Sequence, residues 1–369
     1  MKTKIIIISS MIMVLIIFLA ACTNNQVAGN VVAEQKTVKI GLSLPMTGTA
    51  ASYGENALAG AKLAVKEINS KGGINGIPVE IILEDDECDA KTGATVYNKL
   101  SNIDKVNAIV GPLCSGVASS GLSLTKNTVN VIAMASLAEL TTMGESIFRV
   151  YPSDAYQGKF AAEYIKKQSP NKKIAVFYTQ NSWGQGIYNA FIKNSQGIDI
   201  QYKAGILENQ MDFRLDLTKI KNKEINTIYF IGYPSNTIPF ITQAKELGIK
   251  SKIITGDSST SEEVLNLEIS EGVIALLPRM ELSDEFINKI KSIPEYKNLE
   301  VSISAAYTYD AMYTVFKAME KGGDLKEEIS KIEFKGITND KISFDENGDL
   351  KNTAYQAQII QNGKLVAIN

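Results

Sequence analysis

Residues 38–44 read VKIGLSL, a short run in which nearly every side chain is of a type found in protein interiors. Such a run is typical of a β-strand that is covered on both faces. The turn 45–48 follows, and Tyr53–Ser70 then carries apolar side chains on one face at the spacing of an α-helix. We expect this helix to end at residues 71–73, KGG, because glycine readily takes the left-handed conformation that ends helices. The unit predicts one strand and one covering helix of a parallel sheet.

The same alternation of apolar strands and amphipathic helices continues along the chain. We predict strands at 78–83, 108–110, 129–133, 174–178, 227–231 and 252–255, and helices at 92–100, 115–126, 137–143, 184–195, 237–247 and 305–320. A last pair of strands is expected at 341–344 and 354–360, on either side of the turn 345–349. This order predicts an α/β fold with two doubly wound parallel sheets, the chain leaving the first near 151–154. The chain beyond residue 36 exceeds the ~250–300 residues that one core usually serves, so two lobes are expected.

The N-terminus has the pattern of a secretory signal. Lys2 and Lys4 precede the apolar run Ile5–Ala21, and small residues lead up to Cys22. This ending is similar to a bacterial lipobox, whose cysteine carries a lipid, so we predict a signal peptide at 1–21, lipid attachment at Cys22 and a flexible tether at 22–36. An uncleaved membrane helix is the alternative. Both hypotheses place the following domain outside the cytoplasm, in a periplasm or at a cell surface, and hold it at a membrane.

Composition argues for binding rather than catalysis. The chain has no histidine, which excludes Ser-His-Asp and Cys-His catalytic sets and any metal site that contains histidine. The 38 basic and 40 acidic residues give a net charge of −2, and this near-balance argues against a nucleic-acid partner. We expect no enzyme activity, no cofactor and no metal. An envelope enzyme that uses carboxylates is the rival hypothesis, although no acidic pair stands beside a nucleophile.

Six segments, in order, carry a family resemblance. They read GLSLPMTGTAASYG at 41–54, GAKLAVKEINSKGGI at 60–74, DDECD at 85–89, GPLCS at 111–115, ELT at 139–141 and FDENGD at 344–349. Together they resemble leucine/isoleucine/valine-binding proteins, the extracytoplasmic receptors of branched-chain amino-acid ABC transporters. The resemblance spans roughly residues 37 to 360, which makes it more specific than any single motif.

The resemblance implies a type I periplasmic binding protein fold, in which two α/β lobes are joined by a three-stranded hinge and close around a ligand. Lobe 1 would comprise 37–152 and 279–335, and lobe 2 would comprise 153–278 and 336–369. The family disulfide would join Cys88 and Cys114, and two buried free thiols are the alternative. A disulfide persists outside the reducing cytosol, which agrees with the predicted location.

The resemblance also implies a site for both ends of an amino acid. Ser115 and Ser136 would hold the ligand carboxylate, with Leu113 beside them in the same motif. The alternative for Ser115 is an N-cap. At Ser136 the family has a threonine that contacts both ends of the ligand, and a capping box from Ser136 to Glu139 can coexist with that role. The backbone carbonyl of Met134 and the carboxylate of Asp257 would bind the ammonium group, and a solvated loop position is the alternative for Asp257.

Three aromatic side chains match positions that line the family pocket: Tyr53, Trp183 and Tyr233. Packing at a helix start is the alternative for Tyr53, whereas Trp183 lies in a predicted polar loop, 180–185, where a ligand contact is favoured over a core position. Met134, Trp183 and Ser304 depart from the residues usual in the family, so an amide, urea or aromatic acid is an alternative ligand.

We therefore predict a monomeric, lipid-anchored binding protein that captures a branched-chain or other hydrophobic amino acid by lobe closure. Its partners would be the small-molecule ligand, the permease subunits of an ABC transporter and, through the anchor, the membrane. A ligand sensor of the same fold is the alternative.

Overall fold

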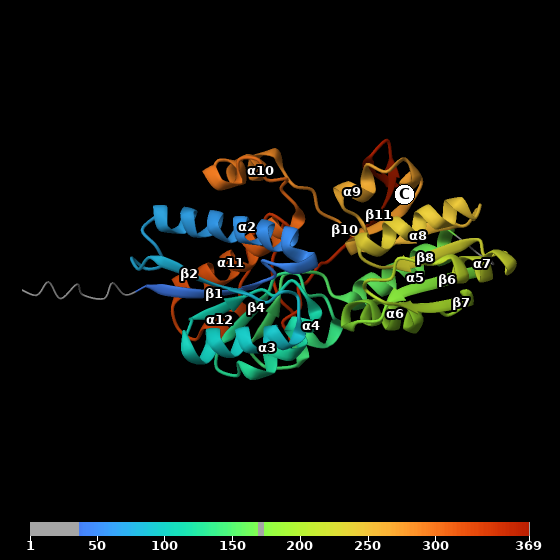
Figure 1. Ribbon diagram of the computed structural model, residues 1–369. Helices are drawn as coiled ribbons and strands as arrows, with labels where there is room; N and C mark the ends of the chain where they lie inside the picture. Colours follow the sequence, from blue (N-terminus) through green and yellow to red (C-terminus); the bar gives the residue numbers. More distant parts are fainter. Residues whose placement is uncertain (1–36, 169–172, 369) are drawn as a thin grey trace, which may run out of the picture. The chain divides into compact units, whose positions relative to one another are not determined.

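The computed structural model describes residues 37–168 and 173–368. The predicted signal peptide, the tether and Cys22 lie outside these residues. The described part also has seven short 3₁₀ or π turns. They are η1 (Gly48–Ala50), η2 (Lys99–Ile103), η3 (Leu122–Leu124), η4 (Ala138–Thr142), η5 (Asp257–Ser259), η6 (Glu268–Ser270) and η7 (Pro294–Tyr296). Its helices and strands form two α/β layers, and each layer consists of one sheet with the helices that cover it (Figure 1).

The first sheet has five parallel strands in the order β2-β1-β3-β4-β5. They are β1 (Val38–Leu44), β2 (Val79–Asp85), β3 (Ala108–Val110), β4 (Val129–Ile132) and β5 (Ile147–Arg149). The helices of this layer are α2 (Ala51–Ser70), α3 (Ala90–Asn98), α4 (Ser115–Gly121), α10 (Asp284–Lys291), α11 (Ile303–Lys321) and α12 (Leu325–Ser330). The predicted strand at 38–44 is therefore the second strand of a parallel sheet, buried along most of its length.

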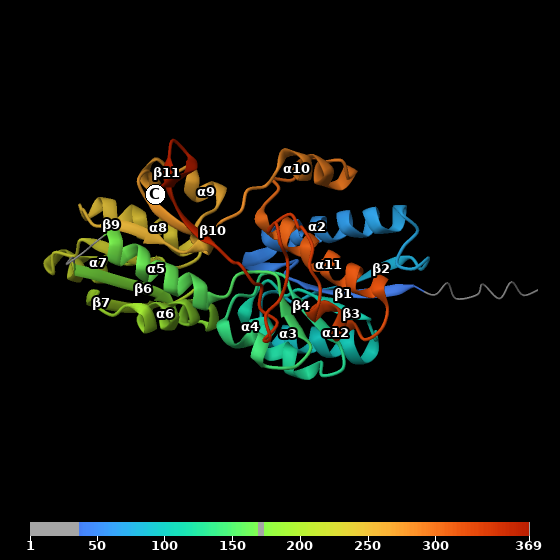
Figure 2. The same ribbon diagram turned by 180° about the vertical axis from the view of Figure 1, so that it is seen from behind.

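Helices α2 and α11 are far apart in the sequence and pack side by side (Figures 1 and 2). Their close approach depends on Gly60, because a Cβ at this position would overlap the backbone of Ala305. The small buried residues Ala57, Ala61 and Ala64 continue the same contact face. The alanine-rich face seen in the sequence is thus a helix–helix contact as well as a sheet contact.

The second sheet has seven strands in the order β12-β11-β10-β9-β8-β6-β7. They are β6 (Lys173–Thr179), β7 (Asp199–Ile206), β8 (Thr227–Ile231), β9 (Lys252–Thr255), β10 (Ile274–Pro278), β11 (Tyr355–Gln361) and β12 (Lys364–Ile368). The helices of this layer are α5 (Asp154–Gln168), α6 (Ser182–Asn194), α7 (Arg214–Asn222), α8 (Pro234–Glu246) and α9 (Glu262–Leu265). The strands from β7 to β10 are parallel, and β11 and β12 are antiparallel to their neighbours.

The chain passes between the two layers three times. It leaves the first sheet after β5, returns after β10 to build α10–α12, and enters the second sheet again at β11. The predicted two-layer α/β fold with a three-segment connection is confirmed. The division at 335/336 stays a prediction, and Ile342, Phe344 and Leu350 pack into the core of the first layer.

One strand prediction is wrong. Residues 341–344 and 354–360 do not pair with each other; Ile342 makes an isolated bridge with Phe334, and Phe344 makes one with Leu350. β11 pairs instead with β10 on one side and β12 on the other. The local alternation of apolar side chains marked these segments as extended, but their partners were set by the tertiary fold.

Candidate functional site

The Ser115 hydroxyl lies at the carboxyl edge of the first sheet and connects two loops. Ser115 is the first residue of α4 and is buried, and its Oγ accepts hydrogen bonds from the backbone N–H groups of Ser136 and Leu137, each at 3.3 Å. Because the oxygen accepts both bonds, its own O–H is free to donate, and no acceptor within residues 37–168 and 173–368 takes it. A hydroxyl held in this way is a suitable donor to a carboxylate.

The local roles considered for these serines differ from the structure. The N-cap of α4 is Cys114, so the N-cap alternative for Ser115 is wrong. The turn η4 has Leu137 as its N-cap and no side-chain capping bond, so the capping box from Ser136 does not form. Helix α4 also ends at Gly121, five residues before the predicted end.

A disulfide fixes the residue next to Ser115. Cys88 and Cys114 are bonded, as predicted, with their Cα atoms 5.5 Å apart and a separation of 26 positions in the sequence. The bond ties the loop after β2 to the start of α4. In the chain-entropy model, closing a loop of this length contributes about 3–4 kcal/mol to stability. It therefore restrains the backbone that carries Ser115.

Met134 and Leu113 complete this edge. Both are half-buried and pack against the core of the first layer. The backbone N–H groups of Met134 and Ala135 both donate to the carbonyl of Pro112, at 3.3 and 3.2 Å. These bonds hold the loop after β4 against the loop after β3, which brings Met134, Leu113 and the two serines together.

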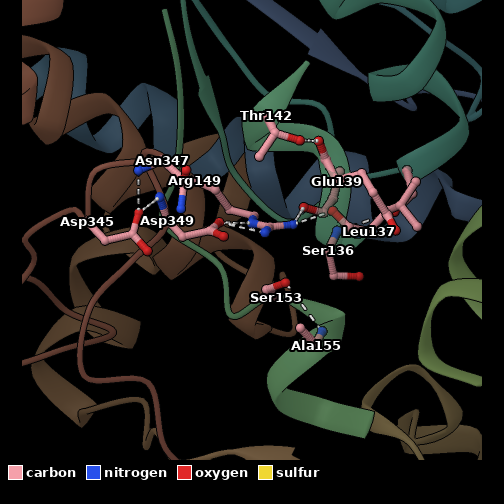
Figure 3. Close-up of polar contacts among 12 residues, drawn as sticks. Ser136, Leu137, Glu139, Thr142, Arg149, Ser153, Ala155, Asp345, Asn347 and Asp349 are labelled. Carbon is pink, nitrogen blue, oxygen red and sulfur yellow. Dashed lines mark hydrogen bonds and ion pairs between the residues drawn. The ribbon is translucent and has the colours of Figure 1, made fainter. Parts of the chain in front are cut away.

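A buried ion pair also supports the loop that carries Ser136 and Leu137 (Figure 3). The guanidinium of Arg149 is fully buried and donates to Asp349 from Nε at 2.8 Å and from Nη2 at 2.5 Å. Its Nη1 donates to the carbonyl of Leu137 at 2.7 Å. Asp349 belongs to the FDENGD segment, in which Asp345 accepts from the backbone N–H groups of Asn347 and Asp349. This motif thus holds the turn next to Ser136.

Asp257 lies at the carboxyl edge of the second sheet, directly after β9. Its side chain is 7% exposed, so the solvated-loop alternative is wrong. Tyr151, from the first connection between the layers, donates to Oδ2 at 2.5 Å, and the backbone N–H of Ser258 donates to Oδ1 at 2.7 Å. Burial raises the pKa of Asp257, although these hydrogen bonds oppose the shift. No ion pair of the described residues includes Asp257.

Tyrosines from both layers surround Asp257. Burial, followed by the charge of Asp257, raises the pKa of Tyr53 on α2, and the same carboxylate contributes to the raised pKa values of Tyr151, Tyr229, Tyr307 and Tyr355. Tyr53 is half-buried, and its carbonyl accepts from Ser304 at 3.1 Å. The structure therefore brings Tyr53 and Asp257, 204 positions apart in the sequence, to one place.

Trp183 and Tyr233 stack on each other, with ring centroids 4.7 Å apart and planes inclined by 26°. The prediction of a polar loop around Trp183 is wrong, because α6 begins at Ser182 and Asn181 caps it. Trp183 is buried against the core of the second layer, whereas Tyr233 is half-buried and its hydroxyl accepts from Asn181 at 3.1 Å. The pair forms an aromatic surface at the start of α6 and α8.

Sequence reasoning missed two residues of α5 and one before it. Tyr151 binds Asp257 directly, and Asp154 and Gln157 lie buried on one face of the first turn of α5. The sequence marked 151–154 only as the point where the chain changes layers. The signal was an acid and an amide three positions apart at a helix start, a spacing that places both on one face.

In the described part of the chain, no group of three or more His, Cys, Asp or Glu side chains could hold a metal ion. The same part contains no helix long and apolar enough to cross a membrane.

Comparison with known proteins identifies the family. A model of the periplasmic binding protein family matches residues 37–364. The chain belongs to the periplasmic binding protein family. The predicted resemblance to leucine/isoleucine/valine-binding proteins is confirmed by a relative from Pseudomonas aeruginosa, the "leucine-, isoleucine-, valine-, threonine-, and alanine-binding protein", which is 31% identical over 87% of this chain and 90% of its own length.

Two solved structures of this family are similar to the chain over 90% of its length. The isoleucine complex of the branched-chain amino-acid substrate-binding protein LivJ from Streptococcus pneumoniae has a TM-score of 0.79 at 27% identity, and the match covers 99% of the LivJ chain. The leucine-binding protein LivK from Thermotoga maritima has a TM-score of 0.81 at 25% identity and is covered over 98%. Periplasmic binding proteins are binding components that work outside the cytoplasm, and this location agrees with the disulfide between Cys88 and Cys114.

Proposed function

We propose that this periplasmic binding protein is lipid-anchored at Cys22, captures a branched-chain or other hydrophobic amino acid, and delivers it to an ABC permease. The two candidate edges suit the two charged ends of such a ligand. Ser115 and Ser136 would donate to the carboxylate, and Asp257 with the Met134 carbonyl would accept from the ammonium group. Leu113 and the aromatic side chains Tyr53, Trp183 and Tyr233 would contact the apolar side chain of the ligand.

The observation that carries the proposal is the burial of Asp257 without a cation. A buried carboxylate is costly unless it is paired, and the bonds from Tyr151 and Ser258 supply hydrogen-bond donors but no positive charge. The ammonium group of an amino acid supplies that charge. The named ligands of the similar proteins, leucine and isoleucine, carry such a group next to an apolar side chain.

Capture would use lobe closure. The contacts of an amino acid with Ser115 and with Asp257 come from different layers, so only a conformation that brings both edges together makes all of them. A ligand that binds both edges therefore favours the closed conformation by the free energy of the contacts that exist only there.

A thermal-shift and calorimetry panel tests the proposal. Leucine, isoleucine, valine and other apolar amino acids are compared with acetamide, urea and benzoate on the purified protein. We expect at least one apolar amino acid to bind with micromolar or lower Kd and to raise the unfolding temperature, because a ligand that binds only the native state stabilises it. Binding of an amide or benzoate alone, with silence for every amino acid, would contradict the proposal.

Delivery is tested separately. Deleting the gene should abolish uptake of the bound amino acid by whole cells, and a Cys22→Ser variant should release the protein from the membrane fraction. Normal uptake after deletion, together with tight binding in vitro, would favour a sensor of the same fold.

A further inference from the structure

Arg149 holds the backbone of the loop that carries Ser136. Its Nη1 donates to the carbonyl of Leu137 at 2.7 Å and to that of Ala135 at 3.5 Å. The N–H groups of Ser136 and Leu137, on the same stretch of chain, donate to Ser115 Oγ. A guanidinium group carries five N–H donors in one rigid plane, so it can fix several acceptors at once. The direction of these two N–H groups, and with it the hydroxyl of Ser115, therefore depends on Arg149.

Arg149 is itself oriented by Asp349, which lies 200 positions away in the sequence. The arginine side chain is fully buried, and its Nε and Nη2 both donate to Oδ1 of Asp349. Burial raises the pKa of Asp349, and the charge of Arg149 opposes this shift. Within residues 37–168 and 173–368, Asp349 is the only ion-pair partner of Arg149. Loss of Asp349 would leave a buried cation without an anion, which is strongly unfavourable in that position.

The turn that carries Asp349 lies on the third connection between the layers and is fixed against β5. The backbone N–H of Arg149 donates to the carbonyl of Gly348 at 2.9 Å. The φ angle of Gly348 is +87°, and a Cβ there would overlap the carbonyl of Ile147, so only glycine fits without displacement. Figure 3 shows the line of contacts from Asp349 through Arg149 to Leu137. The third connection thus reaches the serine loop through two side chains.

The start of α5 is bonded to the same loop. The backbone N–H of Asp154 donates to the carbonyl of Ser136 at 2.7 Å. Burial raises the pKa of Asp154, and a hydrogen bond with the Ser136 side chain opposes this shift. The carbonyls of three consecutive residues, 135–137, therefore accept hydrogen bonds from Arg149 and Asp154. A loop whose backbone groups are satisfied in this way is held in one conformation before any ligand arrives.

We propose that Asp349 is a positioning residue for ligand binding: through Arg149 it fixes the backbone of Ser136 and Leu137, and hence the direction of the Ser115 hydroxyl. This inference rests on the proposed function, in which the serines hold the ligand carboxylate. Asp349 acts through Arg149 and not by contact with the ligand. A binding loop that is already ordered loses less conformational entropy when the ligand binds, so loosening the loop weakens binding. The turn on the third connection therefore sets the affinity of a site that it does not touch.

Asp349→Asn tests the inference, because it removes the charge and keeps one acceptor oxygen. Calorimetry with L-leucine should give a Kd about 3- to 30-fold higher than that of the wild-type protein, the range typical of residues that act on a site through other groups. In the ligand-free variant, hydrogen exchange should become faster at the amides of Ser136 and Leu137. Glu346→Gln is the matched control, since Glu346 is an exposed acid of the same turn, and it should leave both measurements at the wild-type values.

A double substitution separates positioning from stability. Arg149→Met combined with Asp349→Asn removes both charges of the buried pair, so it should recover much of the thermal stability that Asp349→Asn loses. It should not recover the affinity, because the carbonyls of Ala135 and Leu137 still lack their donor. The double variant also replaces Asp349→Asn if the latter does not fold. A wild-type affinity for leucine in the double variant would overturn the inference.

A double-mutant cycle with Ser115→Ala shows whether the effect passes through the serine loop. Asp349→Asn should weaken leucine binding less in the Ser115→Ala background than in the wild-type background, because the hydroxyl that the loop orients is already gone. Equal losses in the two backgrounds, or unchanged exchange at Ser136 and Leu137, would overturn the inference. If the wild-type protein binds benzoate but no amino acid, the proposed function fails, and benzoate, which also carries a carboxylate, replaces leucine in the same comparison. The exchange measurement needs no ligand, so it decides the positioning role independently.

Discussion

The two candidate edges differ in the kind of polar group that they bury. The edge of the first sheet offers the hydroxyls of Ser115 and Ser136, and a disulfide and a buried ion pair fix its loops. The edge of the second sheet offers the buried acid Asp257 within a group of tyrosines. The first edge is suited to an anion and the second to a cation. The asymmetry indicates that a ligand with both charges would bind in one orientation only.

The strongest test of this comparison is Asp257→Ala. We expect the affinity for the amino-acid ligand to fall by a factor of about 100 to 1000, because losing one member of a buried charge pair costs about 3–4 kcal/mol. Calorimetry measures the loss. The ligand-free variant should stay folded, because the substitution removes a buried carboxylate that has no cation, although Tyr151 and Ser258 lose their acceptor. An affinity within threefold of the wild-type value would show that the second edge does not bind the cation.

Ser115→Ala should have a smaller effect. The variant loses one donor to the ligand carboxylate and the acceptor for the N–H groups of Ser136 and Leu137, so we expect a 10- to 30-fold weaker Kd in calorimetry. Ser119→Ala, on the same helix, removes a hydroxyl that bonds to the Ser115 carbonyl and serves as the control. Equal effects of the two substitutions would mean that Ser115 acts through the stability of α4 alone.

The pH dependence of binding should be the smallest effect and should separate the two edges. Burial raises the pKa of Asp257, so protons compete with the ligand ammonium group, and the Kd should increase a few-fold as the pH falls from 7 to 5. The tyrosines around Asp257 stay neutral in this range, because their pKa values are raised as well. Calorimetry at three pH values should give this trend in Ser115→Ala and a flatter one in Asp257→Asn.

The same shifts predict the opposite trend for the stability of the ligand-free protein. An acid whose pKa is higher in the folded than in the unfolded state stabilises the fold at a pH below the unfolded value, and this contribution is lost as the pH rises through the folded value. Asp257 and Asp154 should therefore stabilise the ligand-free protein more at mildly acidic pH, where ligand binding weakens. A pH-independent Kd would contradict the involvement of Asp257 in binding.

The sequence predicted the regular part of the fold well. The strands at 227–231 and 252–255 have the predicted bounds, because each is an apolar run that needs no distant information to be recognised. The segment 341–344 failed for the opposite reason, since its partners Phe334 and Leu350 follow from the path of the third connection. Trp183 was misplaced because polar neighbours concealed the start of a capped helix.

The site could be predicted only where a motif carried it. Ser115 stands next to the disulfide cysteine, and Asp257 directly follows a strand, so both could be placed at sheet edges from the sequence. Tyr151 and Asp154 lie in the connection between the layers and meet residues about 100 positions away. Only the folded chain shows that the charge of Asp257 acts on an acid at the start of α5.

The hydrogen bond between the Asp154 backbone and Ser136 has a consequence for the order of events. The Asp154 backbone N–H donates to the Ser136 carbonyl at 2.7 Å, and this bond joins the beginning of α5, a helix of the second layer, to the loop after β4 of the first layer. An amino acid that is bound by Ser115 and Ser136 would therefore already lie beside the start of α5 before Asp257 reaches it. Asp257 would then make the last of the contacts, with a ligand that is already bound by the first layer.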